Sequence, residues 1–122
     1  MVIGIGVDIV DLAEFRARLT DELAAELFVE TERAYAATQA RPWETLGARL
    51  AAKEAAMKAL RAGLEQGLRW HDVVVEREDD GRVSLDLRGP ARDRAREVGA
   101  SERFLLLSHT KGTAVAVVVL GA

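Results

Sequence analysis

The fold of this chain is decided by Ala51-Ala52-Lys53-Glu54-Ala55-Ala56-Met57-Lys58-Ala59, a run of small residues that also carries charges. We expect this run to lie in a helix from Pro42 to Ala62, because proline fits the first turn of a helix. Its alanines keep the helix thin enough to be buried closely. The run therefore predicts a long helix at the centre of the fold.

Two charged residues of this run, Glu54 and Lys58, lie four residues apart, and Arg61 adds a third polar group to the same side. The plainest interpretation is a solvated pair that stabilises the helix by roughly 0.2–0.5 kcal/mol. For the helix taken alone, that interpretation is the better one. An acid elsewhere in the chain changes the balance.

That acid is Asp8, in an apolar strand that we expect from Val2 to Val10. Alternation places Asp8 on one face with Gly4 and Gly6, whereas the opposite face carries the large side chains of Ile3, Ile5, Val7 and Ile9. Glycine inside a strand often marks the close approach of a ligand or another chain to the backbone. The alternative is that Asp8 simply ends the strand, and this stretch alone favours neither interpretation.

One strand acid, one helix acid and a neighbouring lysine together indicate a different chemistry. Magnesium typically takes one or two carboxylates from the protein and completes its shell with substrate phosphates. We therefore predict that Asp8 and Glu54 are metal ligands for Mg²⁺, with Lys58 beside them.

A third element lies near the C-terminus, where Leu107-Ser108-His109-Thr110 closes an apolar run that begins at Phe104. A second apolar run, Ala114 to Leu120, follows after Lys111-Gly112-Thr113. We expect a hairpin with both strands well buried and His109 at its tip. A histidine at a strand end is often structural, but it can also contact a phosphate or move a proton.

The remaining pattern predicts an α+β fold with a mostly antiparallel sheet wrapped on the long central helix, in one domain spanning residues 1–122. The pair Asp80-Gly81 marks a hairpin turn between two of the expected strands. The other expected elements are helices at Leu12–Leu19, Asp21–Phe28, Thr31–Thr38 and Pro90–Val98, and strands at Val73–Arg77 and Arg82–Leu87.

Composition excludes several classes of protein. The chain has no cysteine, which removes disulfides and thiolate metal sites, and its net charge of −3 gives no general drive toward nucleic acid. The apolar C-terminal run is too short to span a membrane as a helix. We expect a cytoplasmic protein whose acidic partners would contact a local basic patch, with Arg16, Arg18, Arg33, Arg41 and Arg49 as candidates.

Three motifs resemble those of one family: Gly4-Ile5-Gly6-Val7-Asp8, the alanine-rich run around Glu54 and Lys58, and Leu107-Ser108-His109. In order and spacing the chain is similar to the holo-acyl-carrier-protein synthases, the small 4′-phosphopantetheinyl transferases. The resemblance implies transfer of the 4′-phosphopantetheine arm from coenzyme A to a serine of an apo acyl carrier protein. It also implies a homotrimer that binds the nucleotide between neighbouring subunits, in fatty acid synthesis or a dedicated pathway such as polyketide biosynthesis.

The resemblance also implies residue roles. Asp8 and Glu54 would hold magnesium, and Glu54, Lys58 and His109 would be catalytic. The base for the serine hydroxyl would be Glu54 or a metal-bound water, and the sequence does not choose. Coenzyme A would be bound by Arg49, Lys58, Arg61, Gly63 and His109.

The chain departs from the family pattern at two places. Glu14 stands where the family usually has an arginine that meets the carrier protein, so Glu14, Arg16 and Arg18 become the candidate carrier-binding residues. Arg61-Ala62-Gly63 replaces a Gly-Thr-Gly run that lets backbone approach the nucleotide. These departures keep open a family-like trimer that has lost transfer and acts as a binding or scaffolding protein. The joint presence of the motif residues favours the enzyme.

Overall fold

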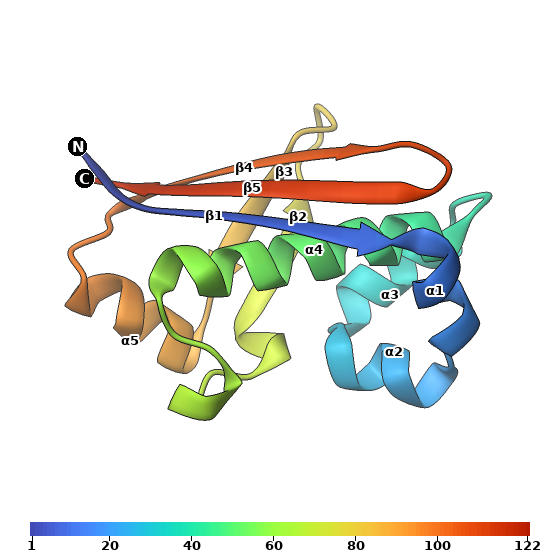
Figure 1. Ribbon diagram of the computed structural model, residues 1–122, viewed down its shortest axis with the longest axis horizontal. Helices are drawn as coiled ribbons and strands as arrows, with labels where there is room; N and C mark the ends of the chain where they lie inside the picture. Colours follow the sequence, from blue (N-terminus) through green and yellow to red (C-terminus); the bar gives the residue numbers. More distant parts are fainter.

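A long helix, α4 (Pro42–Leu60), lies at the centre of the computed structural model, which describes residues 1–122 (Figure 1). A three-stranded sheet covers one side of it and shorter elements cover the rest. The strands are β1 (Val2–Asp11), β2 (Val73–Arg77), β3 (Val83–Leu87), β4 (Glu102–His109) and β5 (Thr113–Gly121). The other helices are α1 (Leu12–Arg18), α2 (Asp21–Leu27), α3 (Glu30–Ala37) and α5 (Gly89–Glu97), with 3-10 turns at Leu64–Gln66 and Trp70–Asp72.

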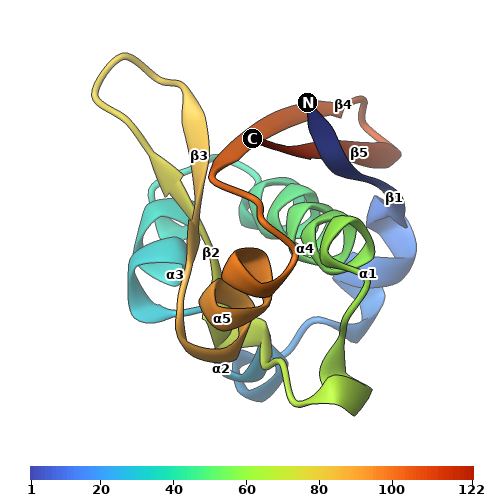
Figure 2. The same cartoon turned by 90° about the vertical axis from the view of Figure 1, so that its left-hand side faces the viewer.

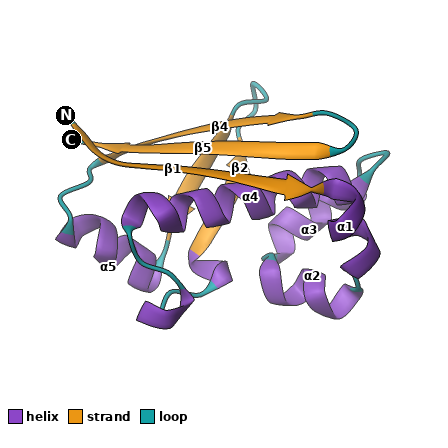
Figure 3. Cartoon of the chain, viewed as in Figure 1, coloured by secondary structure: helices purple, strands orange, loops and turns teal.

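The strands form two antiparallel sheets (Figure 3). In the larger one β5 lies between β1 and β4, so β1 and β4 are its two edges. The smaller one is the β2–β3 hairpin. Seen along α4, the larger sheet lies on one side of the helix and the hairpin and α5 lie on others (Figure 2). The predicted α+β architecture, with antiparallel strands around a central helix, is confirmed.

The alanines of α4 explain how one helix can be enclosed in this way. Ala51, Ala52 and Ala55 are fully buried, and Ala56 and Ala59 are nearly so. Small side chains let the helix axis approach both sheets, where larger ones would keep them apart. The expected thin helix is therefore present, although it ends at Leu60 rather than Ala62.

The glycines of β1 serve this same packing. A Cβ atom on Gly6 would lie 1.8 Å from the carbonyl oxygen of Ala55, and one on Gly4 would lie 2.2 Å from that of Ala59. No side chain fits at either position. The element that approaches the strand is therefore α4 of the same chain, and the interpretation that a ligand or another chain meets these glycines is wrong.

The large apolar side chains of β1 consequently face away from α4. Ile5 is 61% exposed and Ile9 is 64% exposed, and on β4 the exposed fraction of Leu106 is 67%. The expectation of two well-buried C-terminal strands is wrong for β4, whereas β5 buries Ala114, Ala116, Val118 and Leu120 against the helix. The outer face of the larger sheet is thus an apolar surface between two unpaired edges.

Local signals placed most of the remaining elements correctly. Thr20 caps α2 by accepting a hydrogen bond from the backbone N–H of Leu23. The cap of α1 was not predicted: Asp11 accepts from the backbone N–H of Glu14. None of the helices combines the length and the apolar character that a membrane-crossing segment needs.

Candidate functional site

Asp8 lies near the end of β1 on the face that packs against α4. Its Oδ1 accepts a hydrogen bond of 2.8 Å from Nζ of Lys58, which also donates to the carbonyl oxygen of Val7 at 3.1 Å. The Asp8 side chain is 13% exposed and that of Lys58 is 58% exposed. The lysine therefore spans the edge of the sheet, with its charge open to solvent on one side and held by the carboxylate on the other.

Glu54 joins this pair from the preceding turn of α4. Burial, followed by the hydrogen bond and the negative charge of Asp8, raises the pKa of Glu54 to about 7. Burial also acts to raise the pKa of Asp8, but the neighbouring Glu54 carboxyl and the hydrogen bond and charge of Lys58 outweigh it and lower that pKa. The two carboxyls thus share one region of space, and one of them tends to keep a proton when no cation is near.

The Asp8–Glu54 pair fits a hard divalent cation. Oδ2 of Asp8 is buried and has no hydrogen-bond partner, which is costly unless something satisfies it. No group of three or more His, Cys, Asp or Glu side chains surrounds the pair. Two carboxylates without a third protein ligand suit magnesium, which usually completes its octahedron with waters and substrate phosphates.

Lys58 supplies the positive charge of the site. Its hydrogen bond to Asp8, together with the charge of that carboxylate, raises the pKa of the Lys58 amine. The amine therefore stays charged at neutral pH. A strongly hydrated ammonium of this kind can contact a phosphate oxygen without fixed geometry.

Lys53 and Glu32, which the sequence analysis did not single out, form a second acid–lysine pair on the same helix. Both side chains are fully buried, and Nζ of Lys53 donates to Oε1 of Glu32 at 2.8 Å. The amine also donates to the carbonyl oxygens of Trp70 and Val73. The only sequence signal was a lysine inside an alanine run on the side of the helix away from Glu54.

His109 lies away from the carboxylate pair. It ends β4, and β5 separates that strand from β1. Its Nδ1 is 3.8 Å from Oε1 of Glu44, a buried residue ten positions before Glu54 and hence about 15 Å from it along the helix. The expectation that His109 acts with Glu54 and Lys58 is not met within a single subunit.

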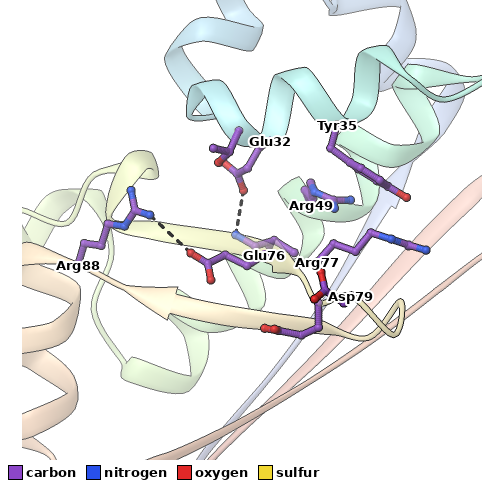
Figure 4. Close-up of a pocket in the computed structure, with 10 residues that line it drawn as sticks. Glu32, Tyr35, Arg49, Glu76, Arg77, Asp79 and Arg88 are labelled. Atoms are coloured by element: carbon purple, nitrogen blue, oxygen red, sulfur yellow. Dashed lines mark hydrogen bonds and ion pairs between the residues drawn. The ribbon is translucent and has the colours of Figure 1, made fainter.

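Arg49 also lies apart from the pair, beside a cavity of about 550 Å³ formed by α3, α4 and β2 (Figure 4). Its guanidinium is 4.9 Å from the centre of the Tyr35 ring, and that of Arg77 is 5.2 Å from the same ring. Arg49 is buried, and its Nε has no hydrogen-bond partner. Burial lowers the pKa of Arg49, yet a guanidinium stays charged. The cavity therefore carries charges of both signs, because four acidic residues also line it: Glu32, Glu76, Glu78 and Asp79.

Arg61 and Gly63 follow the end of α4, near Lys58. Arg61 adopts φ 53° and ψ 39°, and it is the one non-glycine residue with positive φ. Its N–H closes the helix on the carbonyl oxygen of Lys58. The N–H of Gly63 donates to Oε1 of Gln66 at 2.7 Å. Arg61 therefore occupies a left-handed position that glycine adopts more readily.

The three charged residues of α1 fall on two flanks of that helix. Glu14 and Arg18 form an ion pair at 3.0 Å and line a cavity of about 290 Å³ that Glu54 also borders. The guanidinium of Arg16 instead lies 3.6 Å from the centre of the Trp43 ring. Glu14 thus neutralises Arg18 and leaves Arg16 on the other flank.

Comparison with known proteins agrees with these features. A family model described as the 4′-phosphopantetheinyl transferase superfamily matches residues 4–118. The holo-[acyl-carrier-protein] synthase of Streptomyces avermitilis is 43% identical over 97% of this chain and 96% of that protein. That of Geobacter sulfurreducens is 42% identical over 98% of both chains.

Solved structures give the same result. The crystal structure of the holo-[acyl-carrier-protein] synthase of Neisseria meningitidis matches with a TM-score of 0.87 at 27% identity, over 100% of both chains. The Bacillus anthracis holo-(acyl-carrier-protein) synthase in complex with CoA (3′,5′-ADP) matches with a TM-score of 0.82 at 32% identity, over 98% of this chain and 96% of that one.

Proposed function

The chain belongs to the 4′-phosphopantetheinyl transferase superfamily, among the holo-acyl-carrier-protein synthases, and we propose that Asp8, Glu54 and Lys58 form the centre of its transfer site. The enzyme moves the 4′-phosphopantetheine arm of coenzyme A to a serine of an apo acyl carrier protein and releases adenosine 3′,5′-bisphosphate. The observation that carries the assignment of the site is the contact of a strand acid, a helix acid and a lysine at one edge of the sheet.

Asp8 and Glu54 hold a magnesium ion in this proposal. The orphaned Oδ2 of Asp8 and the raised pKa of Glu54 support it, because a cation would satisfy the first and displace the proton of the second. When bound, the ion neutralises charge on the pyrophosphate of coenzyme A. Lys58, held by Asp8, adds a second positive charge for the phosphate that leaves.

The reaction forms a bond between the serine oxygen and phosphorus and breaks the pyrophosphate P–O bond. The hydroxyl proton must go to a base, and the displaced nucleotide phosphate keeps the electron pair of the broken bond. The base would be Glu54, or a water that Asp8 and Glu54 hold through the ion. We assign the charge of the leaving phosphate to Lys58.

The working unit in this proposal is a homotrimer. Ile5, Ile9 and Leu106 expose an apolar sheet face that a subunit contact would bury, and the unpaired β1 and β4 edges are able to meet across such a contact. The β4 edge of one subunit would then bring His109 to the Asp8–Glu54 pair of the next. Arg49, with Arg61 and Gly63 after α4, would contact the nucleotide.

The alternative of a scaffold without activity finds no support in the site. Asp8, Glu54 and Lys58 contact one another as a transferase requires, and nothing in the fold separates them. The identity of the carrier protein and a cytoplasmic location stay predictions.

Intact-mass measurement of apo carrier proteins, incubated with coenzyme A and magnesium, tests the proposed activity. We expect the mass of a 4′-phosphopantetheine group to be added by the wild type and not by Asp8→Asn or Glu54→Gln. Absence of the added mass with every carrier tried, from a folded wild type, would favour the scaffold.

A mixing experiment tests the shared site. Glu54→Gln and His109→Ala are each expected to be weak alone. If one site takes Glu54 from one subunit and His109 from the next, refolding an equal mixture restores about a quarter of the wild-type rate. No recovery in mixed trimers would place His109 outside the site.

A further inference from the structure

Glu44, in the first turn of α4, is a buried acid to which none of the proposed reaction steps gives a role. Its side chain is 7% exposed. One carboxylate oxygen, Oε2, accepts a hydrogen bond from Nε of Arg41, whose own side chain is 59% exposed. An ion pair with so exposed a partner contributes little to stability, whereas burial of a carboxylate is costly. The contact with Arg41 therefore does not explain why an acid lies here.

The other oxygen of Glu44 faces His109 at the end of β4. Oε1 of Glu44 lies 3.8 Å from Nδ1 of the imidazole. The same ring nitrogen is 3.4 Å from the carbonyl oxygen of Thr110. Both neighbours are hydrogen-bond acceptors, so Nδ1 is the nitrogen that carries the proton when the ring is neutral.

The second ring nitrogen of His109 is left for a ligand. Nε2 makes no hydrogen bond within the subunit, and the side chain is 48% exposed. Arg41, Glu44 and His109 line one small cavity of about 170 Å³ where the start of α4 meets the end of β4 (Figure 1). Nε2 of a neutral ring accepts a hydrogen bond, and in the charged ring it donates one to an acceptor such as a phosphate oxygen.

The other histidine of the chain, His71, has the opposite arrangement. Its Nε2 lies 2.8 Å from the carbonyl oxygen of Ala25 in α2, and this contact places the proton on Nε2 of the neutral ring. His71 therefore joins the turn at Trp70–Asp72 to α2 through the nitrogen that His109 leaves free. Of the two rings, only that of His109 has a carboxylate within 4 Å.

The backbone of His109 is held by other contacts, so Glu44 is needed only for the ring. In the turn that follows, the hydroxyl of Thr110 accepts a hydrogen bond of 3.3 Å from the N–H of Gly112. The carbonyl oxygen of Gly112 accepts one of 3.0 Å from the N–H of Leu12, which joins the turn to α1. Rotation about the side-chain bonds is the freedom that remains to His109, and the contact with Glu44 limits it.

We propose that Glu44 is a positioning residue for the transfer reaction. It holds His109 with the proton on Nδ1 and leaves Nε2 to contact the phosphates of coenzyme A in the site of the neighbouring subunit. The inference rests on the proposed function, in which His109 reaches the Asp8–Glu54 pair of the next subunit. Glu44 acts through the ring and does not contact the substrate.

Nitrogen NMR of protein with isotopically labelled histidines tests the arrangement without any need for activity. The chain has two histidines, so His71→Asn assigns both signals. At alkaline pH, where both rings are neutral, we expect the proton on Nδ1 of His109 and on Nε2 of His71. Glu44→Ala should shift His109 toward the mixture of tautomers found in free histidine and leave His71 unchanged.

A double-mutant cycle tests the role in transfer. We expect Glu44→Ala to lower kcat about tenfold, the usual effect of losing a partner that orients a functional histidine. The same substitution in His109→Ala should cost less than about twofold, because the ring that Glu44 holds is absent. Glu44→Gln keeps an oxygen that accepts from Nδ1, so its kcat should lie between those of Glu44→Ala and the wild type.

Two further variants provide the controls. Glu97→Ala removes a glutamate of α5 that is 70% exposed and paired with Arg94 at 3.0 Å, and it should change neither the kcat nor the tautomer of His109. Arg41→Ala removes the other partner of Glu44 and should leave the tautomer of His109 unchanged. Urea unfolding of each variant separates loss of positioning from loss of fold.

The outcomes are distinguishable. If the wild type modifies no carrier protein, the proposed function fails and this inference fails with it. If transfer occurs but Glu44→Ala costs as much in His109→Ala as it does alone, Glu44 acts through Arg41 or the fold and the inference is overturned. A proton on Nε2 of His109 in the wild type, or an unchanged tautomer in Glu44→Ala, would overturn it as well.

Discussion

Two acid–lysine pairs on different sides of α4 use the same chemical groups for different purposes. Lys53 and Glu54 are consecutive residues, so their side chains leave the helix about 100° apart. Lys53 points to Glu32 of α3, and Glu54 points to Asp8 of β1. The difference between the pairs shows how burial and hydrogen bonding decide whether a charge stabilises a fold or is kept for a reaction.

The Glu32–Lys53 pair is closed. Lys53 uses its donors on Glu32, Trp70 and Val73, while the Glu32 carboxylate also accepts from the backbone N–H groups of Val29 and Val75. Burial lowers the pKa of Lys53, and the charge of Glu32 acts against that shift. Because all its partners come from the protein, this pair can connect α3, α4 and β2 but has no capacity left for a ligand.

The Asp8–Glu54–Lys58 group is open. One oxygen of Asp8 has no partner, the pKa of Glu54 is raised to about 7, and Lys58 is largely exposed. The first two features cost stability unless something from outside satisfies them, and the exposed amine of Lys58 is able to contact a ligand. We infer that the group with unsatisfied polar atoms is the functional one, and the following predictions test that contrast.

The largest effect on the closed pair should come from Lys53→Met, which leaves the Glu32 carboxylate buried without a counter-charge. We expect the free energy of unfolding to fall by about 3–5 kcal/mol, as measured by urea denaturation. The double variant Glu32→Gln/Lys53→Met removes both charges and should recover roughly half of the loss. A double variant less stable than the single one would contradict the account of a closed pair.

The open pair should respond in the opposite way. Asp8→Asn and Glu54→Gln are each expected to reduce magnesium-dependent transfer by about 10²–10³-fold, because stabilisation of phosphate charge is lost. The same changes should leave thermal stability nearly unchanged, since Glu54 is buried beside another acid and the ion pair of Asp8 with the largely exposed Lys58 contributes little. Transfer within tenfold of wild type at limiting magnesium would remove Asp8 and Glu54 from the metal site.

A substitution at the strand–helix contact should damage both properties. In Gly6→Ala the new Cβ would lie 1.8 Å from the Ala55 carbonyl oxygen, so β1 must move away from α4. We expect a loss of about 1–3 kcal/mol in unfolding free energy together with reduced transfer, since Asp8 moves with the strand. Gly112→Ala, where a Cβ meets nothing within 4 Å, is the matched control and should change neither.

The pH dependence of stability should distinguish Glu54 from an ordinary surface acid. Its pKa is about 7 in the folded protein against 4.5 for the usual side chain. Between pH 4.5 and 7 the folded state therefore holds a proton that the unfolded state has lost. The contribution of Glu54 to the free energy of unfolding is complete below pH 4.5 and declines as the pH rises to 7. The lowered pKa of Asp8 has the opposite effect on stability, because its contribution is lost as the pH falls through the folded-state pKa of that carboxyl.

In EDTA the unfolding free energy of the wild type, compared with that of Glu54→Gln, should fall between pH 4.5 and 7. Magnesium with coenzyme A should reverse the trend near neutral pH. Parallel curves for the two proteins across this range would show that Glu54 titrates normally.

The smallest expected effect concerns the helix end. Arg61→Gly relieves a left-handed backbone and should raise stability by no more than about 1 kcal/mol, or about 3–5 °C in Tm. Arg61→Ala removes the charge but keeps the backbone conformation, so it should give no gain. An equal gain from both variants would assign the effect to charge.

The sequence predicted the open Asp8–Glu54–Lys58 group well and did not predict the closed Glu32–Lys53 pair. Alternation in β1 placed Asp8 opposite the large apolar residues, and helical spacing placed Lys58 beside Glu54. The pairing of Lys53 with Glu32 depends on how α3 folds back on α4, which neither spacing nor composition contains. The alanine-rich run indicates where the side chains are small, but it does not indicate which charged side chain of the run becomes buried.

The sequence also misled where tertiary packing inverted a local pattern. The glycine face of β1 was expected to meet a ligand or another chain, yet it packs on α4 because only glycine permits that approach. The position of His109 could not be predicted either, because β5 lies between its strand and β1. Both features follow from the arrangement of the strands rather than from any one of them.

The most direct test of the central claim measures magnesium-dependent transfer and urea unfolding on two double variants, Asp8→Asn/Glu54→Gln and Glu32→Gln/Lys53→Met. We predict that the first loses transfer and keeps its unfolding free energy, whereas the second loses stability and keeps the wild-type magnesium dependence of whatever activity it retains. If Asp8→Asn/Glu54→Gln unfolds more easily but still transfers with normal magnesium dependence, the open pair is structural and the account is wrong.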